Sequence, residues 1–127
     1  MREGYAAQRP AVLVVEDEPL QRMMAVDLVE EAGFEAIEAA DADEAVRILE
    51  ARADIRIVFT DIDMPGSMDG MMLAAAIRDR WPPIEIIITS GHIREQEVEM
   101  PIRGVFFPKP YDTRRLSQQL VAFGLPQ

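Results

Sequence analysis

The sequence predicts an α/β domain built around a mostly parallel β-sheet. Segments rich in Val, Ile and Phe alternate along the chain with segments of helical periodicity, and polar residues follow the apolar segments. Alternation of this kind is typical of right-handed βαβ crossovers. The expected strands are Ala11–Val15, Glu35–Glu38, Ile55–Phe59, Ile84–Ile88 and Val105–Phe107.

Three of these segments, Ala11–Val15, Ile55–Phe59 and Ile84–Ile88, are nearly continuous apolar runs. Strands that are covered on both faces read in this way, because neither face meets water. We therefore expect them at the centre of the sheet, with helices on both sides.

Helical patterns fill the gaps between the expected strands. Asp41 can cap the second helix, with Glu44 three residues later completing a capping box. The third helix begins near Asp69 and ends before Trp81-Pro82-Pro83, because proline cannot continue it. The apolar faces are Leu20, Met24 and Leu28 with Met23, then Ala45, Val46 and Leu49, then Leu73, Ala76 and Ile77, and finally Leu116, Leu120 and Phe123 after Asp112.

The stretch from His92 to Arg103 lacks a clean helical stripe and is interrupted by Pro101. We expect a short or irregular helix there, the fourth of about five. The start of the first helix is also ambiguous: Pro19, Leu20 and Met23 form either a partner-docking patch or ordinary core packing.

Length and composition set the outer limits. The chain has 127 residues, enough for one domain, and we expect a loose lead-in over residues 1–10 and the domain over 11–127. There is no cysteine, no apolar stretch of membrane-spanning length and no signal-peptide pattern, which favours a cytoplasmic location. A net charge of −10 argues against direct binding to nucleic acid.

Polar residues gather where the expected strands end. Glu16 and Asp17 follow the first strand, Asp61 the third, Thr89-Ser90 the fourth and Lys109 the fifth. In open parallel sheets, ligands bind outside the carboxyl ends of the strands. These side chains should therefore meet at one edge of the sheet.

The residue types at this edge indicate phosphoryl chemistry. Glu16, Asp17 and Asp61 would repel one another unless a proton or a cation intervenes, and oxygen ligands without Cys or His favour Mg²⁺ as the cation. Asp61 ends the most central apolar run, and carboxylates act as nucleophiles in forming aspartyl phosphates. Mg²⁺, Lys109 and Thr89 can together stabilise the three peripheral oxygens of a phosphoryl group.

The ordered set of motifs resembles the receiver domain of two-component response regulators, over about residues 10–124. The motifs are Val14-Val15-Glu16-Asp17-Glu18, Thr60-Asp61-Ile62-Asp63-Met64-Pro65, Met68-Asp69-Gly70, Ile88-Thr89-Ser90-Gly91 and Phe107-Pro108-Lys109-Pro110-Tyr111. The last two look like those of stand-alone regulators and of receivers fused to hybrid kinases.

This resemblance implies a flavodoxin-like fold with strand order 2-1-3-4-5. It implies Mg²⁺-dependent phosphoryl transfer to Asp61 from a phosphohistidine on a histidine kinase or phosphotransfer protein. The protein would then catalyse only its own phosphorylation and dephosphorylation, and would signal through partner binding or a phosphorelay.

The resemblance also implies roles for individual residues. Asp17 and Asp61 ligate Mg²⁺ directly, Glu16 acts through water, and the backbone carbonyl of Asp63 adds a ligand. Thr89 and Lys109 contact the phosphate. Further implied features are a cis Lys109–Pro110 bond and a switch formed by Thr89 and Phe106.

Three features depart from the family pattern. The loop Pro65–Gly70 is one residue longer than is usual, and the segment His92–Arg103 is short. Phe106 stands where the switch residue is often Tyr, and its alternative role is simple core packing. Two other functions stay open: a haloacid-dehalogenase-like phosphatase, suggested by Asp61-Ile62-Asp63, and a pseudo-receiver that binds a partner without phosphorylation.

Overall fold

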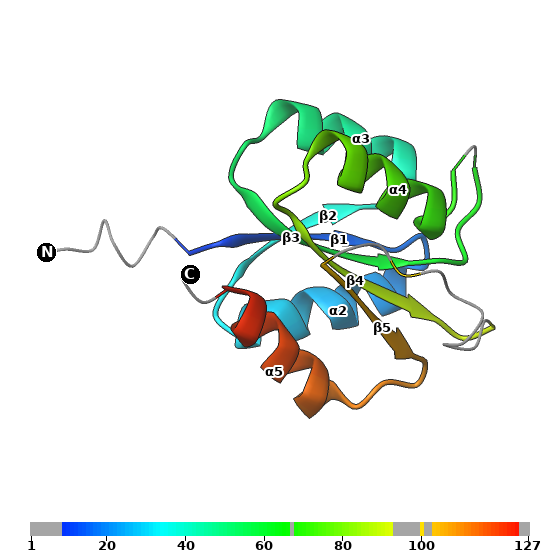
Figure 1. The fold of residues 1–127 in the computed structure, drawn as a ribbon. Helices are drawn as coiled ribbons and strands as arrows, with labels where there is room; N and C mark the ends of the chain where they lie inside the picture. The colour runs from blue at the N-terminus through cyan, green and yellow to red at the C-terminus, as the bar shows by residue number, and fades with distance from the viewer. Residues whose placement is uncertain (1–8, 67, 93–99, 101–102, 125–127) are drawn as a thin grey trace, which may run out of the picture.

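Five parallel strands form one sheet in the order β2-β1-β3-β4-β5, which confirms the predicted order (Figure 1). The computed structural model describes residues 9–66, 68–92, 100 and 103–124. The strands are β1 (Ala11–Val15), β2 (Glu35–Ala39), β3 (Ile55–Asp61), β4 (Glu85–Ser90) and β5 (Gly104–Pro108).

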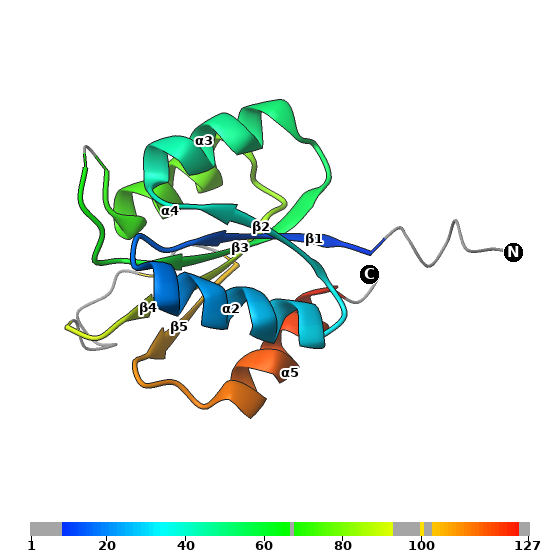
Figure 2. The same cartoon turned by 180° about the vertical axis from the view of Figure 1, so that it is seen from behind.

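The described helices are α2 (Pro19–Glu31), α3 (Ala42–Ala51), α4 (Gly70–Arg80) and α5 (Thr113–Gly124). Helices α3 and α4 cover one face of the sheet, and α2 and α5 cover the other (Figures 1 and 2). Alternating residues of β1 serve the two sides: Leu13 and Val15 pack under α3 and α4, whereas Val12 and Val14 pack under α2 and α5. The central strands are buried on both faces, as their apolar runs predict.

Side-chain caps fix where the helices begin. The Oδ1 atom of Asp41 accepts a hydrogen bond from the Glu44 amide at 2.8 Å, and Asp69 caps α4 in the same way. The predicted capping box is shifted by one residue, because Glu44 Oε1 accepts from the Ala40 amide at 2.7 Å rather than from that of Asp41.

The predicted apolar face of the first helix is wrong except for Leu28, which is half-buried and packs against the core. Leu20, Met23 and Met24 are 60%, 55% and 62% exposed, and α2 instead buries Ala25 and Val29. The four-residue spacing of Leu20, Met24 and Leu28 correctly predicts a helix. The side of the helix that faces the sheet is the adjacent one, which carries Ala25 and Val29. Core packing is therefore excluded for Leu20 and Met23.

Two strands extend further than their apolar runs. β3 reaches Asp61 and β4 reaches Ser90, because the parallel pairing continues through polar residues such as Asp61 opposite Thr89. Asp61, Thr89 and Ser90 thus end the strands rather than follow them. Their backbones are held in the ladder, which limits the freedom of their side chains.

Most of the segment expected to form an irregular helix, residues 93–99 and 101–102 of 92–103, lies outside the described residues, and so do residues 1–8 of the expected lead-in over 1–10. None of the helices in the described part of the chain is long and apolar enough to cross a membrane.

Candidate phosphoryl and metal site

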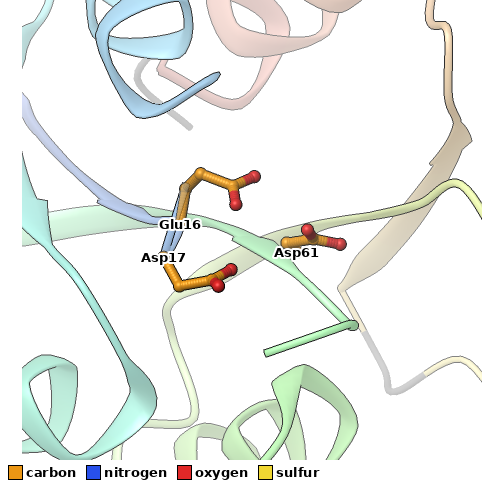
Figure 3. A group of neighbouring side chains, drawn as sticks. All are labelled: Glu16, Asp17 and Asp61. Carbon is orange, nitrogen blue, oxygen red and sulfur yellow. The ribbon is translucent and has the colours of Figure 1, made fainter. Parts of the chain in front are cut away.

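The carboxyl ends of β1 and β3 bring three carboxylates together (Figure 3). Glu16 and Asp17 come directly after β1, and Asp61 is the last residue of the adjacent β3. One oxygen from each residue lies within 4.8 Å of the others. Glu16 and Asp61 are buried at 6% and 7% exposure, and Asp17 is half-buried.

Backbone contacts fix Asp61 from both sides. The amide of Ile62 donates to the carbonyl of Thr89 at 2.8 Å, which ties the end of β3 to β4. On the other side, the first residue of α4 approaches so closely that a Cβ on Gly70 would lie 2.1 Å from the Asp61 carbonyl oxygen. Only glycine fits at this position.

Lys109, which directly follows β5, points its ammonium into the acidic cluster. Its Nζ donates to Asp61 Oδ2 at 2.9 Å and to Glu16 Oε1 at 3.3 Å. The backbone amide of Lys109 donates to the carbonyl of Ser90, the last residue of β4. The peptide bond between Lys109 and Pro110 is cis.

Burial and charge shift the pKa values in this cluster. Burial raises the pKa of Glu16, and the charge of Asp61 raises it further, although the Glu18 amide and Lys109 oppose the shift. Burial works to lower the pKa of Lys109, but the hydrogen bond and charge of Asp61, together with Glu16, raise it overall. Lys109 therefore stays protonated at neutral pH.

The three carboxylates and one ammonium are not balanced in charge. Lys109 contacts two of the acids, and no described side chain bonds to the carboxylate of Asp17. A hollow of about 280 Å³ opens over the cluster and is lined in part by Asp17, Asp61 and Lys109. The three clustered carboxylates offer only oxygen donors, which fit a hard divalent cation, and Mg²⁺ keeps several waters that such a hollow can hold.

The remaining predicted residues surround this cluster. Thr89 is 2% exposed, pairs with Asp61 in the ladder, and lines a small cavity behind Asp61. Phe106 is 7% exposed and packs in the core on the α3 and α4 side of the sheet. In this conformation Phe106 is a core residue, and its function as a switch stays a prediction.

Two contacts at the site have no counterpart in the sequence predictions. Ser90 Oγ donates to Asp63 Oδ2 at 2.7 Å, which joins the loop after β3 to the end of β4. Gln21 Oε1 accepts from Lys109 Nζ at 2.7 Å, across 88 residues of sequence. Gln21 reads as an ordinary exposed position of a helix, so no local signal marks it.

Comparison with known proteins assigns the family. Residues 12–121 match the response regulator receiver domain. The chain is 34% identical over 110 residues to the sensor kinase CckA of Brucella abortus and 32% identical over 116 residues to the aerobic respiration control protein ArcA of Escherichia coli. These alignments cover 84% and 87% of the chain but 12% and 46% of the relatives, so the chain spans less than half of either protein.

Solved structures agree with this assignment. The receiver domain of the hybrid histidine kinase CckA superposes with a TM-score of 0.76 at 30% identity, covering 91% of this chain and 99% of that one. A response regulator receiver protein from Clostridium thermocellum gives 0.80 at 25% identity, covering 89% and 92%. With its flavodoxin-like fold and acidic pocket, the chain belongs to the response regulator receiver domains of two-component signalling.

Proposed function

We propose that this domain accepts a phosphoryl group on Asp61 from a phosphohistidine of a histidine kinase or phosphotransfer protein, with Mg²⁺ as cofactor. The observation that carries this proposal is the contact between Lys109 Nζ and Asp61 Oδ2, within an acidic cluster that still lacks charge balance. The cluster is arranged to bind a cation and an anion together.

The bond changes follow from this arrangement. An oxygen of Asp61 attacks the phosphorus of the donor; the new P–O bond forms as the P–N bond breaks, and the imidazole leaves with its electron pair. Bound Mg²⁺ supplies charge neutralisation for the approaching anion. Lys109 donates to a phosphoryl oxygen, and the Thr89 hydroxyl, next to Asp61 on β4, donates to another.

Asp17 and Asp61 are the direct ligands that we propose for the metal. The carbonyl of Asp63 adds a third, and Glu16 acts through water. The carboxylate of Asp17 is half-buried and has no bonding partner among the described side chains, which supports the direct ligation by Asp17. The assignments of the Asp63 carbonyl and of Glu16 depend on the family resemblance.

A surface for the donor lies next to this site. Leu20, Met23 and Met24 expose their side chains on α2. Of these, Met24 lines a groove of about 430 Å³ together with Leu28, Pro110 and Tyr111. We place the phosphodonor there, because the groove reaches Lys109 itself. The exposure of Leu20 and Met23 supports the docking patch over the core alternative.

Incubation with acetyl phosphate tests the proposal without a known kinase. Intact mass spectrometry should show a gain of one phosphoryl group that requires Mg²⁺. The Asp61→Ala variant should show no gain, whereas Asp79→Ala, which removes an exposed carboxylate of α4, should behave as wild type. A wild type that gains no mass contradicts the proposal and leaves the pseudo-receiver function. A gain that survives in Asp61→Ala contradicts the proposal by placing the phosphoryl group on another residue.

A further inference from the structure

The Asp17 carboxylate is held in the acidic cluster through its backbone. No described side chain bonds to this carboxylate, yet one of its oxygens lies within 4.8 Å of oxygens of Glu16 and Asp61, and it points toward Asp61 (Figure 3). Carboxylates that lie this close repel one another. The conformation of the backbone around Asp17 therefore determines where its carboxylate lies.

Hydrogen bonds fix the peptide units on both sides of Asp17. The Nη1 atom of Arg22 donates to the carbonyl oxygen of Glu16 at 2.8 Å, which holds the peptide that leads into Asp17. The amide of Glu18 donates to Glu16 Oε2 at 3.1 Å, which holds the peptide that follows Asp17. The Glu18 contact lies within the turn after β1, whereas Arg22 reaches this turn from helix α2.

Arg22 is itself fixed by its surroundings. Its side chain is 21% exposed, and its Nε donates to Oε1 of Glu38, near the end of β2, at 3.1 Å. Its backbone amide donates to the carbonyl of Glu18 at 2.9 Å, in the first turn of α2. Because the guanidinium is planar and presents its N–H groups in a rigid fork, these contacts leave it little freedom. Arg22 thus ties the turn after β1 to both β2 and α2.

The charge of Arg22 works against a cation at this site. A positive charge beside a cation site lowers the affinity for the cation. Any favourable contribution of Arg22 to metal binding must therefore come from the geometry that it imposes on the backbone. Charge and geometry predict opposite effects of removing Arg22, so an experiment can separate them.

We propose that Arg22 is a positioning residue for the metal: it holds the peptide between Glu16 and Asp17, so that the Asp17 carboxylate faces the site before a cation binds. This inference rests on the proposed binding of Mg²⁺ by Asp17 and Asp61. Without Arg22 the peptide has more conformational freedom, and ordering it opposes binding. Groups that orient metal ligands typically contribute about 10- to 100-fold in metal affinity.

Calorimetric titration with MgCl₂ at constant ionic strength tests this inference. Arg22→Met removes the bond to the Glu16 carbonyl and should raise the Kd for Mg²⁺ about tenfold, although the loss of positive charge alone would lower it. Arg22→Lys keeps the charge and can donate from a single nitrogen, so its Kd should lie between those of wild type and Arg22→Met. The control Arg47→Met removes an exposed arginine of α3 and should leave the Kd within about twofold of wild type.

The sign of the Arg22→Met effect decides the outcome, with circular dichroism establishing that each variant is folded. A Kd equal to or below that of wild type overturns the inference, because Arg22 would then serve only to stabilise the fold. Where Arg22→Met does not fold, a wild-type Kd in Arg22→Lys overturns it. A wild type that does not bind Mg²⁺ overturns the proposed metal site itself, which is a different failure.

Discussion

The two ends of the sheet carry charge in opposite ways. At the carboxyl end, three acids and one lysine are crowded together, and Glu16 and Asp61 are buried. At the amino end, charges come in exposed pairs, such as Arg80 with Glu50 at 2.8 Å, where both side chains are nearly half exposed. Arg103 and Glu85 form another pair at 2.8 Å, in which Arg103 is exposed and Glu85 is partly buried.

This difference distinguishes the charged residues of a functional site from charged residues that only keep the protein surface hydrated. Exposed ion pairs contribute little to stability and need no ligand. A buried excess of negative charge costs stability, and a fold retains it where a ligand or a reaction uses it. The contrast between the two ends therefore identifies the site without reference to any relative, and it can be tested by substitution and by adding metal.

The largest effect on stability is expected at Gly70, where the carboxyl end of the sheet leaves no room for a side chain. Gly70→Ala would place a Cβ 2.1 Å from the Asp61 carbonyl oxygen and 2.7 Å from the Ile62 Cα. We expect a loss of about 3 kcal/mol in the free energy of unfolding, measured by urea denaturation, because backbone has to move. Gly91→Ala is the matched control, since its nearest contact would be 3.9 Å away, and it should cost below about 1 kcal/mol.

Mg²⁺ should stabilise the protein through the carboxyl end alone. A ligand that binds only the folded state at 100 times its Kd adds about 2.7 kcal/mol to the free energy of unfolding. Thermal melts with and without Mg²⁺ should show this gain in the wild type and in Glu50→Gln. Asp17→Asn should lose most of it; an equal gain in Asp17→Asn would place the metal elsewhere.

In the absence of metal, the same Asp17→Asn substitution should stabilise the protein. Removing one of three mutually repelling carboxylates should raise the free energy of unfolding by about 0.5–1 kcal/mol in EDTA. Urea denaturation at low ionic strength measures the gain, which should shrink as salt screens the repulsion. A destabilised Asp17→Asn would mean that its carboxylate has a structural partner.

The smallest effect is expected for the pair at the amino end. A double-mutant cycle of Arg80→Ala and Glu50→Gln should give a coupling energy of about 0.2–1 kcal/mol. The cycle is needed because the Arg80 guanidinium also lies 4.4 Å from the centre of the Trp81 ring. A coupling energy above about 2 kcal/mol would contradict the claim that the exposed ion pairs at the amino end contribute little to stability.

Much of the fold follows from the sequence because its signals are local. The apolar runs at Ala11–Val15 and Ile55–Phe59 predict buried strands, Asp41 caps α3 as expected, and α4 begins directly after Asp69, near the predicted start. Helix α2 is the exception. Ala25 and Val29 face the sheet, while the bulkier Met24 faces outward, so size and hydrophobicity point to the wrong stripe.

The members of the site were predictable because parallel strands bring their carboxyl ends to one edge. That rule places Glu16, Asp61 and Lys109 together without any knowledge of their contacts. Pairings between side chains carry no comparable signal. The bonds from Lys109 to Gln21 and from Ser90 to Asp63 depend on how α2 and the loops are placed, which only the structure shows.

The most direct test of the central claim is to locate the phosphoryl group. Borohydride reduces an aspartyl phosphate and leaves a carboxylate unchanged, so treatment after exposure to acetyl phosphate and Mg²⁺ marks the acceptor permanently. Peptide mass spectrometry should then find the reduced residue at Asp61 and at no other acidic residue. Reduction at Asp63, at Asp17, or at no position at all would contradict the account.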